Sequence, residues 1–219
     1  MVYEGEWYNS KPHGYGKNYY RNGGFYEGTF YNGLPHGYGR FINPNGDYYQ
    51  GDIKFGRGNG EGYYYAGDVV FHGEFKDNNL HGEGEERGTD YYFKGTYEYG
   101  NKSKGTLKYG ACIYEGGFEE DQFEGKGVLT TADGRYVGEF HNGNQHGYGE
   151  FVWNNGSKYR GHYVRGIREG DGEFFNSENN TIVRGLWSKG KPEGDGEYVE
   201  PRGHVNRVIW AEGHITSVK

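Results

Sequence analysis

Residues 26–40 read YEGTFYNGLPHGYGR, and residues 3–17 read YEGEWYNSKPHGYGK. Both stretches contain an aromatic-x-Gly-x-aromatic segment, a short link and an x-Gly-x-Gly segment. The first segment recurs nine times, and the eight steps from Gly5 to Gly185 give a period of about 22.5 residues. We therefore interpret the chain as a tandem repeat, and the repeat unit as the determinant of the fold.

Each repeat has two halves. The first halves are Tyr3-Gly5-Trp7, Tyr26-Gly28-Phe30, Tyr49-Gly51-Ile53, Phe71-Gly73-Phe75, Phe93-Gly95-Tyr97, Tyr114-Gly116-Phe118, Tyr136-Gly138-Phe140, Tyr159-Gly161-Tyr163 and Val183-Gly185-Trp187. The second halves are HGYG at 13–16, 36–39 and 146–149, NGEG at 59–62, HGEG at 81–84, EGKG at 124–127, and EGDG at 169–172 and 193–196.

The spacing inside each half predicts a β-strand. Tyr3, Gly5 and Trp7 recur every second residue and so share one face of an extended chain. The links between repeats carry turn residues that accept a positive φ: Asn22-Gly23, Asn45-Gly46, Asp133-Gly134 and Asn155-Gly156. The links within repeats, such as residues 9–12 and 32–35, turn the chain the other way. A helix is disfavoured, because each interior glycine would cost about 1 kcal/mol.

The core predicted by this pattern is aromatic. Consecutive hairpins would pair edge to edge, and each glycine would leave a hollow over which a neighbouring ring lies flat. We therefore predict an all-β fold: an elongated, single-layer antiparallel sheet of stacked β-hairpins, with eighteen strands spanning roughly 85 Å. Stability should be approximately a sum over neighbouring repeats, with the ends weakest.

Composition narrows the class of protein. The chain has 219 residues, of which 44 are glycine and 19% are aromatic, within a hydrophobic total of 32%. The aromatic content argues against disorder. The 31 acidic residues outnumber the 24 basic ones, which disfavours a nucleic-acid partner. Cys112 is the only cysteine, no apolar run reaches about 20 residues, and the repeat begins at Tyr3, so we expect a cytoplasmic protein.

The YEGEW and HGYG segments, repeated with a period near 23, resemble the MORN repeat over residues 3 to about 200. The resemblance implies a twisted sheet of stacked hairpins and a function in holding other molecules. Similar repeats occur in ciliary radial spoke heads, cytoskeletal scaffolds and junctophilins, and beside kinase or methyltransferase domains. This sequence shows no appended catalytic domain, membrane anchor or polybasic linker, so the repeats themselves are expected to act.

Two parts of the chain depart from the repeat. We assign residues 1–202 to nine MORN-type hairpins and residues 203–219 to a degenerate C-terminal capping segment. In the fifth repeat, Leu107 stands where the pattern predicts glycine; this is explained by drift with local repacking, by a partner site or by a bend. In the sixth repeat, Glu119, Glu120 and Asp121 belong to an acidic run that is either solvated surface or a site for a basic partner.

Candidate catalytic and metal sites fail on geometry. Histidines at 13, 36, 81 and 146 share one repeat position, but equivalent residues lie two strands apart, roughly 9.6 Å, too far to share a zinc ion. Glu4 and Glu6 lie about 6.7 Å apart, with no other element converging on them. Residues 185–192 resemble a phosphate-binding loop but end in Pro192 and precede no helix. We therefore predict no enzyme activity, no cofactor and no metal.

The candidate binding residues are surplus aromatics. Adjacent tyrosines point to opposite faces of a strand, so one member of each pair is not needed by the core. The candidate partner-binding residues are Tyr19, Tyr20, Tyr48, Tyr49, Tyr63, Tyr64, Tyr65, Tyr91, Tyr92, Glu119, Glu120 and Asp121.

We predict a non-enzymatic scaffold or adaptor. It would bind an extended or helical segment of a partner protein along an aromatic-lined trough, and the family resemblance suggests a ciliary or cytoskeletal complex. The alternatives are a peripheral module that binds phosphoinositides, disfavoured by the scattered basic residues, and a non-catalytic accessory subunit of a larger enzyme complex.

Overall fold

The computed structural model describes residues 2–219, and these form strands and turns with no helix among them. The chain divides into two compact units, the first ending at Gly110 and the second comprising Ala111–Lys219. The strands of unit 1 are β1 (Val2–Tyr8), β2 (Lys11–Tyr19), β3 (Phe25–Tyr31), β4 (Leu34–Ile42), β5 (Tyr48–Lys54), β6 (Arg57–Ala66), β7 (Val69–Lys76), β8 (Asn79–Arg87), β9 (Tyr91–Glu98) and β10 (Asn101–Tyr109). The strands of unit 2 are β11 (Cys112–Glu119), β12 (Gln122–Thr130), β13 (Gly134–His141), β14 (Asn144–Trp153), β15 (Lys158–Val164), β16 (Ile167–Asn176), β17 (Thr181–Ser188), β18 (Lys191–Val199), β19 (Val205–Ala211) and β20 (His214–Val218).

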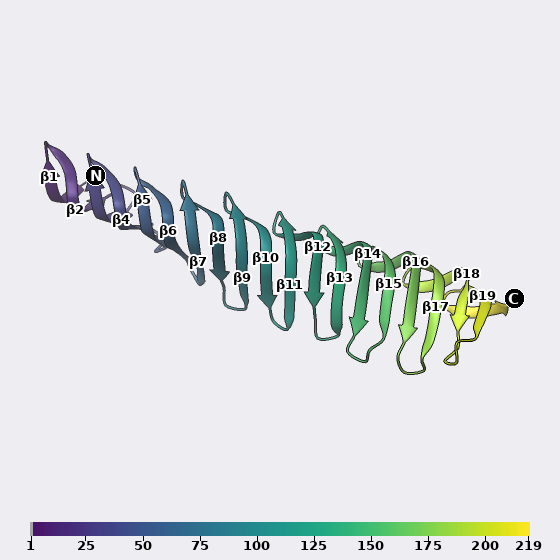
Figure 1. Ribbon diagram of the computed structural model, residues 1–219. Helices are drawn as coiled ribbons and strands as arrows, with labels where there is room; N and C mark the ends of the chain where they lie inside the picture. Colours follow the sequence, from purple (N-terminus) through teal and green to yellow (C-terminus); the bar gives the residue numbers. More distant parts are fainter. Residues whose placement is uncertain (1) are drawn as a thin grey trace. The chain divides into compact units, whose positions relative to one another are not determined.

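Within each unit, every strand pairs antiparallel with the strand that follows it in the chain, as Figure 1 shows. This confirms the predicted all-β sheet of stacked hairpins. The number of strands exceeds the eighteen predicted, because residues 203–219 contribute β19 and β20.

The two glycines of the x-Gly-x-Gly segment have different roles. In the second hairpin Gly28 pairs with Gly39 and Phe30 pairs with Pro35, so the second strand has two more residues than the first between these pairs. Gly37 lies in this bulge with φ 94°, a conformation that favours glycine. Seven other hairpins have the same two-residue excess.

The second glycine makes room for a ring. A Cβ atom on Gly39 would lie 2.5 Å from two ring carbons of Tyr26, whose side chain is 0% exposed. In six repeats the hydroxyl of the corresponding tyrosine also donates to a main-chain carbonyl three residues along, where the bulge interrupts the ladder. These bonds are Tyr3 to Glu6 (2.8 Å), Tyr26 to Thr29 (2.9 Å), Tyr49 to Asp52 (2.8 Å), Tyr114 to Gly117 (3.0 Å), Tyr136 to Glu139 (3.0 Å) and Tyr159 to His162 (3.2 Å).

Edge-to-face ring contacts couple several neighbouring repeats within each unit. The ring centroid of Tyr136 lies 5.1 Å from that of Phe140 in its own repeat and 5.2 Å from that of Tyr163 in the following one. Tyr3 contacts Phe30 of the next repeat in the same way, at 4.9 Å. Each such pair is worth about 0.5–1.5 kcal/mol beyond the area it buries. In the first hairpin, Trp7 is 59% exposed.

The prediction about turns was partly wrong. The links within repeats are the tight two-residue turns, with positive φ at both positions, as at Asn32 (50°) and Gly33 (90°). Between repeats, Gly46 has φ 95° as expected, but it lies in a longer link. Gly134 lies in β13 without a positive φ. The bulge lies at the end of each hairpin that the link within the repeat closes, and that link is the tighter of the two kinds of turn. Residue types alone do not show this.

The fifth repeat differs from its prediction as well. Gly105 pairs with Gly95 and therefore takes the place of Gly39, while Leu107 pairs with Phe93 at a position that is aromatic in five other repeats and leucine, Leu129, in the sixth. The real departure lies two residues before Gly105. Ser103 stands where other repeats have the bulge glycine, and here the second strand has only one extra residue between matching pairs.

The last seventeen residues form a further hairpin. Val208 and Trp210 of β19 are buried against β18, and a Cβ atom on Gly196 would meet the Trp210 ring at 3.2 Å. Deleting residues 203–219 should lower the melting temperature and the solubility, because Val199 and the edge of β18 would become exposed. Thermal melts and sedimentation of the two lengths test this capping role; unchanged melting and solubility would contradict it.

Candidate interaction surface

Each unit has two sheet faces. The aromatic face carries the ring positions of the repeat, such as Tyr26 and Phe30, and the opposite face carries the intervening residues, such as Glu27 and Thr29. The structure distributes the predicted tyrosines between them. Tyr49, Tyr64 and Tyr91 belong to the aromatic face, Tyr19, Tyr48, Tyr63, Tyr65 and Tyr92 belong to the opposite face, and Tyr20 directly follows β2.

Tyr49 is the core tyrosine of the third repeat. Its side chain is only 8% exposed, its hydroxyl donates to the Asp52 carbonyl, and its ring lies against Gly51, Gly58 and Gly62. Tyr48, its neighbour in the chain, lies on the opposite face and is the more exposed of the two rings.

The opposite-face tyrosines of unit 1 form a stacked row. The ring centroid of Tyr65 lies 4.3 Å from that of Tyr48 and 6.2 Å from that of Tyr63. Tyr63 in turn stacks on His72 at 4.0 Å and is 41% exposed. The row therefore joins three of the predicted residues, and His72 was missed because no repeat position marks it.

Carboxylates hold the end of this row. The Glu61 carboxylate lies 2.8 Å from Nε2 of His72, and the Glu85 carboxylate lies 3.6 Å from Nδ1. The Tyr92 hydroxyl donates to Glu85 at 2.6 Å and, with Arg87, lowers the pKa of that carboxyl. These polar bonds are satisfied within the protein, which makes the row a stiffened surface with little unused hydrogen-bonding capacity.

The aromatic face of unit 1 contains an open hollow of about 390 Å³. Four rings line it, those of Phe41, Tyr49, Tyr64 and Phe75, and Asn43 and Asn78 stand among the other lining residues. The hollow exists because Gly58 takes a position that Pro35 and Leu80 fill in the neighbouring repeats. The missing side chain leaves the floor of rings uncovered.

Neither a metal cluster nor a membrane span is found in the described part of the chain. Among residues 2–219, no three His, Cys, Asp or Glu side chains are grouped so as to hold a metal ion. The same residues include no helix with the length and apolar character needed to cross a bilayer.

Comparison with protein families decides which family the chain belongs to. The family described as "MORN repeat" matches seven segments, which together cover more than half of the chain: residues 3–25, 26–48, 71–91, 114–134, 136–158, 159–177 and 184–205. The chain belongs to the MORN-repeat family. No curated protein matches it.

The two MORN hairpins outside these segments are the third and the fifth. The third has Ile53 at its second ring position and Gly58 where a larger side chain is usual, while the fifth has Ser103 in place of the bulge glycine. The third hairpin nevertheless pairs with the second and the fourth, and the fifth pairs with the fourth, as the other repeats of unit 1 do. The pairing geometry thus extends through hairpins whose residues are atypical.

The acidic residues of the sixth MORN repeat lie at the tip of its hairpin. Glu119 ends β11, and Glu120 and Asp121 form the tight turn, with φ of 49° and 60°. All three are exposed. At this position the three carboxylates are accessible both to solvent and to a basic partner.

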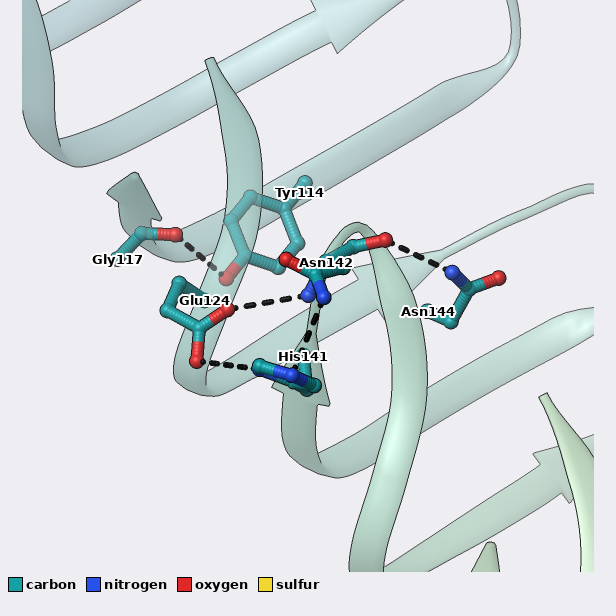
Figure 2. A network of polar contacts seen from close by, with 6 residues as sticks. All are labelled: Tyr114, Gly117, Glu124, His141, Asn142 and Asn144. Atoms are coloured by element: carbon teal, nitrogen blue, oxygen red, sulfur yellow. Dashed lines mark hydrogen bonds and ion pairs between the residues drawn. The ribbon is translucent and has the colours of Figure 1, made fainter. Parts of the chain in front are cut away.

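Figure 2 shows a polar network beside that turn, with residues from β11, β12 and the seventh MORN repeat. The Glu124 carboxylate lies 3.1 Å from Nδ1 of His141 and accepts the Asn142 main-chain N–H at 3.1 Å. These contacts lower the pKa of Glu124, and the hydrogen bond with His141 has the largest effect. Glu169 and Glu193 accept main-chain N–H groups of the next hairpin turn in the same way. The glutamate at this position therefore joins adjacent repeats.

One buried charge pair was missed by sequence reasoning. Glu86 is buried at a ladder position where other repeats have rings such as Phe41, and Lys102 Nζ lies 2.8 Å from its carboxylate. The hydroxyls of Tyr97 (3.3 Å) and Tyr91 also donate to it. The sequence did contain a signal for this pair. Glu86 stands at a repeat position that usually holds a ring, and Lys102 stands where the next repeat has an apolar residue.

Proposed function

We propose that this protein is a non-enzymatic scaffold that binds a segment of a partner protein along the aromatic face of its MORN repeats. A MORN array is a repeat scaffold that can mediate protein or membrane interactions, and seven MORN segments account for more than half of this chain. The observation that carries the proposal is the hollow of unit 1, where four aromatic side chains line a space with amide groups around it.

The chemistry of this hollow suits a peptide. Rings at its floor can bury an apolar side chain of a partner, and the amides of Asn43 and Asn78 can hydrogen-bond to the partner's main chain. The chain has 31 acidic and 24 basic residues, and this excess of negative charge disfavours binding to anionic lipids, which clustered lysines and arginines hold. A protein segment is therefore favoured over a membrane surface.

The proposed setting is cytoplasmic, within a ciliary or cytoskeletal complex, where the protein acts as an adaptor or as a non-catalytic accessory subunit. The support is the family resemblance of the repeats and the nearly complete use of the chain in them. A fluorescent fusion expressed in the native cell tests the setting. Enrichment at cilia or at the cytoskeletal cortex is the expected result, and a diffuse or organellar signal would contradict it.

Photo-crosslinking tests the binding face. We expect a photoreactive phenylalanine at Tyr64 to crosslink to a defined partner protein in the native cell, whereas the same residue at Tyr15, exposed on the opposite face, should not. Mass spectrometry of the adducts identifies the partner and the segment bound. Equal labelling from both positions would refute the proposed face, and retention of the protein by phosphoinositide vesicles would favour the lipid alternative.

A further inference from the structure

The second hollow of the aromatic face lies in unit 2 and contains a positive charge. Its volume is about 730 Å³, and it is lined by Ala132, Asp133, Gln145, Phe151, Trp153, Asn154, Asn155, Tyr163, Gly166, Ile167, Arg168 and Gly190. Arg168 lies in β16, paired with Tyr163 of β15. In several other repeats this ladder position is apolar, as at Pro35, Leu80 or Phe123, while Lys102 and Gln145 hold it in the fifth and the seventh.

The Arg168 guanidinium rests on rings. Its Cζ atom lies 4.6 Å from the ring centroid of Trp187, 5.4 Å from that of Tyr159 and 6.0 Å from that of Phe174. These cation–π contacts fix the side chain but leave its N–H groups without an acceptor. Among residues 2–219, no carboxylate forms an ion pair with Arg168, although Asp133 lines the same hollow.

The buried pair in unit 1 shows what such a position can hold. Lys102 occupies the same ladder position as Arg168, and it is neutralised by Glu86 of the preceding repeat, which also accepts the Tyr97 hydroxyl. In unit 2 the residue equivalent to Glu86 is Phe151, and the residue equivalent to Tyr97 is Tyr163. The cation is therefore retained while the carboxylate is absent.

The Tyr163 hydroxyl is the second unused donor. Tyr163 lines the hollow, and its hydroxyl has no hydrogen-bond partner among the described residues. One guanidinium and one hydroxyl thus face a space lined also by Phe151 and Trp153. A single negative charge beside an apolar group matches this set, because charge-assisted hydrogen bonds are strong where aromatic walls exclude water.

We propose that this hollow binds an acidic segment of the partner protein, with a carboxylate on Arg168 and Tyr163 and a neighbouring aromatic or aliphatic side chain against Phe151 and Trp153. The inference rests on the proposed function and adds the chemistry of the segment. A phosphate group fits less well, because it would bring up to two negative charges to one cation in a hollow that Asp133 also lines.

The test compares N-acetyltryptophan with N-acetyltryptophanamide, two probes that differ only in the carboxylate. Binding is followed by the indole N–H signals of Trp153 and Trp187 in the NMR spectrum of the full chain. We expect the acid to bind about tenfold more tightly than the amide. Arg168→Met should abolish this preference, while Arg160→Met, a matched loss of a cation from β15, should preserve it.

A second variant guards against misfolding. Phe151→Glu should supply the carboxylate internally, as Glu86 does for Lys102, and should abolish acid binding while keeping or raising the melting temperature. Equal affinities of acid and amide, or a preference that survives Arg168→Met, would overturn the inference. Tighter binding of inorganic phosphate, or of vesicles carrying a phosphoinositide, would overturn it in favour of those ligands. These outcomes are independent of crosslinking at Tyr64, which tests the proposed function in unit 1.

Discussion

Raising the pH from about 8 to about 11 is expected to unfold unit 2, and to destabilise unit 1 less. Burial raises the pKa of Tyr114 and of Tyr159 to about 12 and raises the pKa of Tyr136 and Tyr163 further. Unit 1 has two tyrosines with comparably large upward shifts, Tyr26 and Tyr49.

The sign follows from linkage. An unfolded tyrosine has a pKa of about 10, so these buried rings stabilise the fold fully below about pH 10, and that contribution is lost as the pH rises through their folded pKa values. Unit 2 has four such tyrosines and unit 1 has two, so the loss of stability above about pH 10 should be larger in unit 2.

Urea unfolding at several pH values measures this effect. Tryptophan fluorescence reports mainly on unit 2, which contains Trp153, Trp187 and Trp210. Tyr136→Phe should reduce the loss of stability above pH 10, because phenylalanine does not ionise. Tyr148→Phe, on an exposed ring, is the control and should leave the pH dependence unchanged. A urea midpoint that is constant between about pH 8 and pH 11 would contradict the prediction.

Gly149→Ala should strongly destabilise unit 2. A Cβ atom at this position would lie 2.5 Å from two ring carbons of Tyr136, which is 0% exposed and hydrogen-bonded to the Glu139 carbonyl. The ring must leave its place, and displacing a buried aromatic side chain costs about 3 kcal/mol or more. Denaturant unfolding measures the loss.

A double-mutant cycle identifies the cause. In a Tyr136→Leu background the ring atoms that crowd Gly149 are gone, so adding Gly149→Ala should be close to neutral. Gly203→Ala is the control, since no atom lies within 4 Å of its Cβ position and only its φ of 85° is unfavourable; it should cost about 1 kcal/mol. Equal costs of Gly149→Ala in both backgrounds would show that the ring does not need the space.

Much of the fold could be predicted because the residue spacing within each repeat indicates the strands, and the recurrence of that spacing indicates the order of the hairpins. Alternation of Tyr26, Gly28 and Phe30 places them on one strand face, and the recurrence of the pattern fixes consecutive hairpins. The predicted role of glycine under the rings is confirmed by the crowding at Gly39. Such features depend on local residue types and on periodicity, which sequence contains directly.

The candidate site was less predictable. The rule that neighbours point to opposite faces separated Tyr48 from Tyr49, but it did not say which one is buried. The stacking of Tyr63 on His72 brings together residues of two strands, and no repeat position marked His72. Binding surfaces depend on which neighbours leave a ring uncovered, as Gly58 does in unit 1, and that requires the register of adjacent strands.

The sequence by itself determined the hairpin repeat, the family and the aromatic core, because each follows from residue spacing within one period. Only the tertiary structure decided where the bulges fall, that tyrosine hydroxyls bond to the carbonyls beside them, and that Lys102 has a carboxylate while Arg168 has none. The physical reason is register. A two-residue excess in the second strand of eight hairpins offsets neighbouring side chains, and the charge balance of each hollow depends on that offset.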